Sequence, residues 1–107
     1  MEEFNWSQSE KKIAKEAFDK AYQNEMIEIK NELTKKLNNL KGLQEIWKIH
    51  DYLSYRRKEV DKKYDYRYSM LIILFGRLYN EGYLKEKDLE GLSQEKIERI
   101  KSIANFK

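Results

Sequence analysis

Apolar residues recur at steps of three to five along the first forty positions of the chain, with lysine, glutamate, asparagine and glutamine on the far side. They form one row: Ile13, Ala17, Ala21, Met26, Ile29, Leu33, Leu37 and Leu40. This spacing is typical of the buried face of an amphipathic α-helix. We expect the helix to begin just after Trp6, because Ser7 and Glu10 fit a capping box.

No helix breaker intervenes before Gly42, so this helix would run for about nine turns, or roughly 50 Å. A compact chain of this size has a radius of only ~13 Å, and another surface must therefore cover the apolar row. Asn38 to Gly42 is the predicted break, with Gly42 or an asparagine in a left-handed cap. A link this short makes the next helix, expected from about Leu43 to Lys63, an antiparallel neighbour.

The last third of the chain has the pattern of shorter helices. A third helix is expected from about Tyr66 to Asn80, with Asp65 as its cap and Gly82 at its end. A short helical turn from Glu86 to Glu90 stops at Gly91. Ser93 then caps a last helix lined by Ile97, Ile100 and either Ile103 or Ala104. The sequence thus predicts one all-α domain, with a long-helix dimerisation stem over residues 1–65 and a helical head over residues 66–107.

One face of the second predicted helix mixes residue types that do not usually share a face. Its members lie three or four residues apart: Leu43, Trp47, His50, Leu53, Arg57, Val60 and Tyr64. A solvated face would be more uniformly polar, and a core face would hold no arginine. The mixture indicates contact with another chain. Asp51 and Arg57 are then candidates for pairing, with the partner chain's copy or with the Trp47 indole N–H, because charges inside an interface are costly unless paired.

Composition narrows the class of protein. Charged residues make up 38% of the 107 positions and proline is absent, which favours long solvated helices. A hydrophobic content of 40% supports packing and argues against disorder. Cysteine is absent, so disulfides and thiolate metal sites are excluded. The acidic start Met1–Phe4 is unlike a signal peptide, and the longest apolar run, Met70–Phe75, is too short to span a membrane.

The only histidine is followed by an aspartate, which raises the question of acid–base or metal chemistry. Neighbours on a helix point about 100° apart, so Asp51 is not expected to orient His50 as a catalytic partner. A zinc site would need further histidine or cysteine ligands, and the sequence has none. We therefore predict no catalytic, metal or cofactor site, and an interface role for His50.

Nucleic-acid binding is the other chemistry that the charges suggest. The cations Arg56-Arg57-Lys58 and Lys62-Lys63 could contact phosphates, and nearby tyrosines could stack on bases. Glu59, Asp61 and Asp65 interleave with them, and the net charge is only +3. No clear basic stripe survives, so nucleic acid is not the expected partner.

The same segment carries a string of uncommon residues in fixed order. It comprises Trp47-Lys48-Ile49-His50-Asp51-Tyr52-Leu53, Arg57, Glu59-Val60-Asp61 and Lys63-Tyr64-Asp65-Tyr66-Arg67. Other matching positions are Trp6-Ser7-Gln8, Phe18, Ala21-Tyr22, Glu25, Glu81-Gly82, Leu89 and Leu92. Over nearly the whole chain, and without evident gaps, this pattern resembles the fluorescence recovery protein family.

The resemblance implies an all-helical homodimer with long antiparallel helices and a smaller head, without pigment or covalent chemistry. It implies binding to the C-terminal domain of the photoactivated orange carotenoid protein. That binding would speed the partner's return to its resting orange form and its release from the phycobilisome, which ends photoprotective quenching. The implied location is the cytoplasm, at thylakoids through the phycobilisomes.

The resemblance also implies which residues make the contacts. The dimer and partner patch comprises Ile46, Trp47, His50, Asp51 and Arg57, with Leu53 on the same helix face. The head contacts are Ile73 and Arg99.

Three positions depart from the family pattern. Lys62 stands where glycine is common, Ile73 replaces an aromatic residue, and Tyr55 replaces a small residue beside the patch. Two alternatives for the partner therefore stay open. One is an unknown protein in a bacterium without phycobilisomes. The other is nucleic acid, bound by the cations between Arg56 and Lys63. Nucleic-acid binding would be recognised by a steep loss of affinity as the salt concentration rises.

Overall fold

The computed structural model describes residues 4–105, and the acidic start Met1–Glu3 lies outside this range. Four α-helices and one 3₁₀ helix follow in order: α1 Gln8–Asn38, α2 Glu45–Lys63, α3 Tyr68–Glu81, η1 Glu86–Leu89 and α4 Gln94–Asn105. The prediction of an all-helical fold is confirmed. None of the helices within residues 4–105 is both long and apolar enough to cross a membrane.

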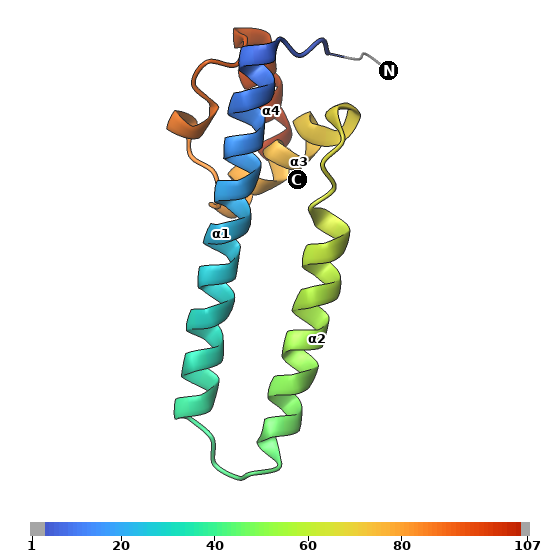
Figure 1. Cartoon of the computed structure of the whole chain (residues 1–107). Helices are drawn as coiled ribbons and strands as arrows, with labels where there is room; N and C mark the ends of the chain where they lie inside the picture. The colour runs from blue at the N-terminus through green and yellow to red at the C-terminus, as the bar shows by residue number, and fades with distance from the viewer. Residues whose placement is uncertain (1–3, 106–107) are drawn as a thin grey trace.

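The molecule is an elongated rod with a thicker end. α1 and α2 run side by side in opposite directions, and the remaining elements gather around the first half of α1 (Figure 1). The principal extents are 53 × 26 × 26 Å and the radius of gyration is 16.7 Å, against ~13 Å for a compact chain of this length. The accessible surface is 7927 Å², whereas a compact 13.1 kDa monomer exposes about 6,400 Å². The chain thus leaves roughly 1,500 Å² more surface open than its mass requires.

Both ends of α1 are closed by local hydrogen bonds. The Ser7 hydroxyl accepts from the Glu10 N–H at 3.1 Å, and the Glu10 carboxylate accepts from the Ser7 N–H at 3.1 Å, so the predicted capping box is confirmed. The predicted left-handed cap at Gly42 or an asparagine is wrong, because positive φ angles within residues 4–105 occur only at Gly82 and Gly91. Asn39 closes the helix instead, donating its backbone N–H and its side-chain amide to the Lys35 carbonyl.

The start of α3 also differs from the prediction. The helix begins at Tyr68, and Asp65 does not cap it, because its carboxylate accepts a 2.8 Å hydrogen bond from Arg67 Nε. Gly82 ends the helix with a φ of 88°, as expected of a left-handed C-cap. The Ser93 hydroxyl accepts from the Lys96 N–H at 3.3 Å, which confirms the predicted cap of α4.

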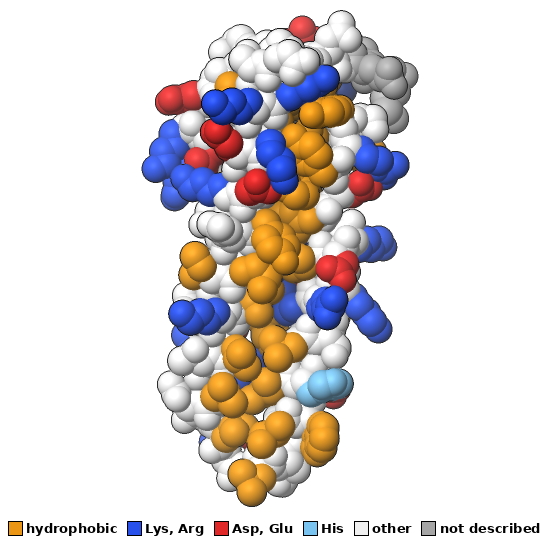
Figure 2. Space-filling view, in the orientation of Figure 1, with side chains coloured by type: hydrophobic (Ala, Val, Ile, Leu, Met, Phe, Trp, Pro, Cys, Tyr) orange, Lys and Arg blue, Asp and Glu red, His pale blue; other side chains and the backbone are white. Residues whose placement is uncertain are grey.

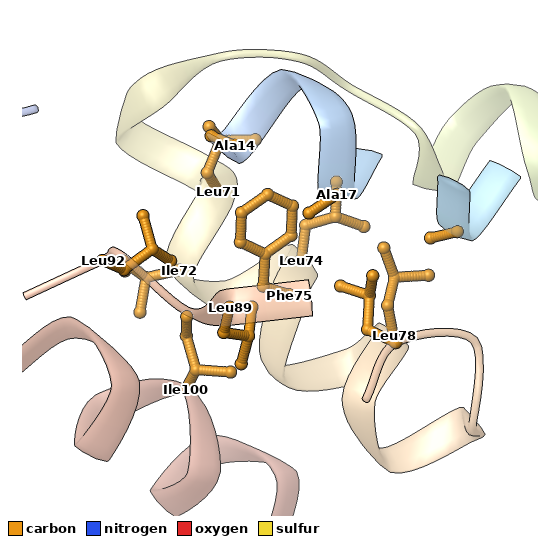
Figure 3. Packing of buried hydrophobic residues seen from close by; sticks show 12 residues of the cluster. Ala14, Ala17, Leu71, Ile72, Leu74, Phe75, Leu78, Leu89, Leu92 and Ile100 are labelled. Atoms are coloured by element: carbon orange, nitrogen blue, oxygen red, sulfur yellow. The ribbon is translucent and has the colours of Figure 1, made fainter. Parts of the chain in front are cut away.

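The hydrophobic core lies in the head. Figure 3 shows the Phe75 ring at its centre, with Ala14 and Ala17 of α1 on one side and Leu89 and Ile100 on the other. The first half of α1, which the sequence prediction assigns to the stem, therefore belongs to the core of the head. α4 approaches α3 so closely at Gly76 that an added Cβ would lie 2.5 Å from Ile103 Cγ2.

Candidate protein-interaction surface

Large apolar side chains that stay exposed are concentrated on the stem. Among residues 4–105, eight of the eleven such residues belong to it: Tyr22, Met26, Ile27, Leu37, Leu43, Ile46, Trp47 and Tyr55. Figure 2 shows an apolar band that follows the stem over most of its length. Two helices side by side can bury only the sides that face each other, so the rest of their apolar rows stays open.

The orientation of α2 decides which residues this band contains. The helix turns Ile49, Val60 and Lys63 inward, and these three are buried. The face that the sequence singled out overlaps this buried side at Val60, near the head. Closer to the turn the same face is open: Trp47 is 70% exposed, and Leu43, which precedes the helix, is 81% exposed. An exposed face with tryptophan and leucine at this density is typical of a binding surface.

A groove between the two stem helices lies within this band. Its volume is about 370 Å³, and its lining comprises Tyr22, Met26, Ile29, Leu53, Arg56, Arg57, Val60 and Asp61. Two of the predicted contact residues, Leu53 and Arg57, thus lie in one groove. The Arg57 guanidinium is 84% exposed and approaches Asp61 Oδ2 at 3.6 Å, so it remains available to a binding partner.

Trp47, His50 and Asp51, three of the predicted contact residues, lie close together near the turn. The rings of Trp47 and His50 are 6.4 Å apart and nearly perpendicular. His50 Nδ1 lies 3.5 Å from Asp51 Oδ1, which is longer than an ordinary hydrogen bond. The two side chains are 68% and 84% exposed. No group of three or more histidine and carboxylate side chains within residues 4–105 is placed to hold a metal ion.

The two predicted head contacts lie apart from this patch. Ile73 is 49% exposed and lines a second hollow of about 490 Å³ between α3 and the end of α2, beside Met70, Arg77 and Lys62. Arg99 lies exposed on α4. Both are accessible to a protein that contacts the head.

Beneath the surface, a cluster of charged groups joins the stem to the head. Glu25 of α1 is only 1% exposed. Its carboxylate lies 2.6 Å from Lys63 Nζ and 2.7 Å from Arg56 Nη2. The Tyr64 hydroxyl donates to it at 2.8 Å. Lys63 also contacts Glu81, at the end of α3, at 2.9 Å. We call these five residues the Glu25 cluster, which ties together α1, α2 and α3.

The environment of this cluster shifts the pKa values of its members. Burial, followed by the hydrogen bond to Glu25, raises the pKa of Tyr64. Burial alone would raise the pKa of Glu81 as well, but hydrogen bonds from Lys63 and Arg77 outweigh it and hold that pKa below its ordinary value. Tyr64 is therefore neutral and Glu81 ionised at neutral pH, the states that these hydrogen bonds require.

The prediction from sequence missed this cluster, although one signal was present. The buried residues of α1 include Ala17, Ala21, Glu25 and Ile29, so a glutamate occupies one step of the apolar row. A carboxylate at an inward position needs a cationic partner. Arg56 and Lys63, seven residues apart on one face of the next helix, supply it.

Comparison with known proteins leads to one family, both by sequence and by structure. The sequence model of the photoprotection regulator fluorescence recovery protein family matches residues 6–104. The chain is 36% identical over 101 residues to the fluorescence recovery protein of Synechocystis sp. PCC 6803, covering 94% of this chain and 93% of that protein.

Solved structures agree with the fold. The fluorescence recovery protein of Fremyella diplosiphon superposes with a TM-score of 0.87 at 36% identity, covering 95% of this chain and all of that one. The Synechocystis structure gives a TM-score of 0.87 at 35% identity over the same shares. At this identity and coverage the likeness extends to the whole arrangement of helices.

Proposed function

This chain belongs to the fluorescence recovery protein family of photoprotection regulators, and from this premise we propose its partner and its mode of action. It acts as a cytoplasmic, non-enzymatic homodimer. It binds the C-terminal domain of the photoactivated orange carotenoid protein and speeds the return of that protein to its resting orange form. Photoprotective quenching at the phycobilisome then ends.

The open apolar face of the stem is the observation that carries this proposal. Roughly 1,500 Å² of surface beyond that of a compact monomer is exposed, and a stable protein interface buries about 800 Å² on each side. A second copy of the chain would therefore cover only part of the excess. The exposed surface that a second copy would leave uncovered supports another contact, with the orange carotenoid protein. Trp47, His50 and Arg57 would lie nearest to that partner. Ile73 and Arg99 extend this contact to the head.

The mechanism is differential binding. A protein that makes no covalent bond can speed a conformational change only by binding the transition arrangement more tightly than the starting one. Each ~1.4 kcal/mol of such preference accelerates relaxation about tenfold. The Glu25 cluster supports this role, because it holds stem and head in a fixed relation, so that contacts on both can act on the same partner.

The test is to add this protein in excess to photoactivated orange carotenoid protein in the dark and to follow the loss of the red form by absorbance. We expect the relaxation rate to rise with protein concentration until it saturates. An unchanged rate at excess would refute the proposed partner while leaving the family and the fold as they stand. Sedimentation of the protein alone tests the homodimer separately.

A further inference from the structure

The net positive charge of the chain is not spread evenly. The whole sequence has 22 basic and 19 acidic side chains, which gives +3. Residues 30–48, which we call the tip, contain the end of α1, the turn and the start of α2. The tip holds five lysines and two glutamates: Lys30, Lys35, Lys36, Lys41, Lys48, Glu32 and Glu45. It therefore carries a net +3 by itself, and the rest of the chain is balanced.

The five tip lysines have no carboxylate partner within residues 4–105, a property they share with some exposed lysines elsewhere, such as Lys12 and Lys87. Within residues 4–105, ion pairs shorter than 4.0 Å join α1 to α2, α2 to α3 and α4 to α1, among others. None of the five tip lysines takes part in one. Unpaired like charges held together at the end of a rod repel one another, so the tip is stabilised by whatever anionic group approaches it.

The tip has a shape that suits a protruding group. A hollow of about 310 Å³ lies between the two helices there, and it shares no lining residue with the stem groove. Its lining comprises Lys35, Lys36, Asn39, Leu40, Glu45, Lys48 and Ile49. Three lysines thus surround two aliphatic side chains, with Glu45 as the one acid in the lining. Leu43, 81% exposed, stands at the turn beside it.

We propose that the tip is a docking site for an acidic segment of the partner protein, one in which Asp or Glu residues flank an apolar side chain. The apolar side chain enters the hollow against Leu40 and Ile49, and its acidic neighbours pair with Lys35 and Lys48. A hollow that combines lysines with two aliphatic side chains suits a polypeptide better than a flat lipid surface. This inference deepens the proposed function, on which it rests, by stating the chemistry of a second contact on the partner.

A synthetic peptide of alternating Glu and Leu residues, labelled with fluorescein, is the probe, and the same peptide with Gln for Glu is its control. Fluorescence anisotropy measures binding to the wild type and to two double variants. One variant removes two tip charges by Lys35→Gln and Lys48→Gln. The matched variant removes two exposed head-side charges by Lys12→Gln and Lys87→Gln, which also have no carboxylate partner among residues 4–105.

We expect the tip variant to bind the Glu peptide about tenfold more weakly than the wild type at low ionic strength, and the matched variant to bind it unchanged. The Gln peptide should not bind. Equal binding by the tip variant, or no binding of the Glu peptide by the wild type, would overturn the proposal. Lysine-dependent binding to phosphatidylglycerol vesicles without peptide binding would also overturn it, in favour of a lipid surface.

The same two variants separate this inference from the proposed function. If the wild type accelerates relaxation of the orange carotenoid protein and the tip variant does so equally at every concentration, the tip proposal fails alone. If the wild type has no effect on relaxation but binds the Glu peptide through its tip lysines, the proposed function fails alone. We expect the tip variant to need about tenfold more protein for half-maximal acceleration.

Discussion

Replacing Glu25 by Ala should weaken the junction between stem and head more than any exposed substitution does. The change removes the carboxylate that Lys63, Arg56 and Tyr64 share and leaves two cations in a buried site. Breaking a buried ion pair from one side costs about 3–5 kcal/mol. Here part of that cost is offset, because Lys63 keeps Glu81 at 2.9 Å. We therefore expect the free energy of unfolding to fall by about 3 kcal/mol, the lower end of that range.

Urea unfolding followed by far-UV circular dichroism measures this loss, at one fixed protein concentration because dimerisation would add to the apparent stability. A loss of about 3 kcal/mol corresponds to a Tm lower by roughly 10–20 °C for a domain of this size. Glu25→Gln keeps the shape and an acceptor for Tyr64 but removes the charge, so its loss should lie between zero and that of Glu25→Ala.

Asp19→Ala is the matched control for this prediction. Asp19 lies on the same helix and pairs with Lys15 at 2.9 Å, but its side chain is 56% exposed. An exposed pair contributes only about 0–1 kcal/mol. If Glu25→Ala destabilises the protein no more than Asp19→Ala does, the Glu25 cluster does not hold the junction together.

The remaining predictions concern the surface and the effect of pH. Ile46→Glu should yield monomers by light scattering. Ile73→Glu, at a site of nearly equal exposure (49% against 46%), should leave the dimer intact and reduce the acceleration of partner relaxation. A dimeric Ile46→Glu protein would contradict the proposed interface. Arg57→Leu should abolish acceleration while changing the stability by less than about 0.5 kcal/mol, because Arg57 is 84% exposed; retained acceleration would remove Arg57 from the partner contact. The pKa values of Glu10 and Glu81 lie below the ordinary 4.5 in the folded protein, so their stabilisation is complete above that pH and is lost as the pH falls through the lower folded values. Urea unfolding measured at a series of decreasing pH values checks this. A midpoint urea concentration that stays constant as the pH is lowered below 4.5 would contradict it.

The family resemblance, and with it the proposed partner, came from residue order in the sequence, and the comparisons confirm the family. In the predicted patch, Ile46, Trp47, His50, Asp51 and Arg57 are exposed, as residues of a binding surface must be, and Leu53 is half-buried. Its role as a dimer and partner contact stays a prediction that the variants above address.

Several boundaries of the fold were determined by local sequence alone. The Ser7–Glu10 capping box, the left-handed Gly82 and the Ser93 cap each depend on residues within four positions of one another, so their geometry can be predicted without knowing the fold. The long amphipathic pattern of α1 was equally plain, because helical periodicity is a property of neighbouring residues.

Only the tertiary structure decided how charges far apart in the sequence are paired. Glu25 meets Arg56 and Tyr64 across 31 and 39 positions. Its place in the apolar row marks it as inward-facing, but nothing local identifies its partners. Arg56, Lys63 and Lys96 likewise find carboxylates on neighbouring elements, whereas at the tip a single turn joins two helices and no third element lies nearby (Figure 1). A pair interaction depends on separation in space, and the sequence states only separation along the chain.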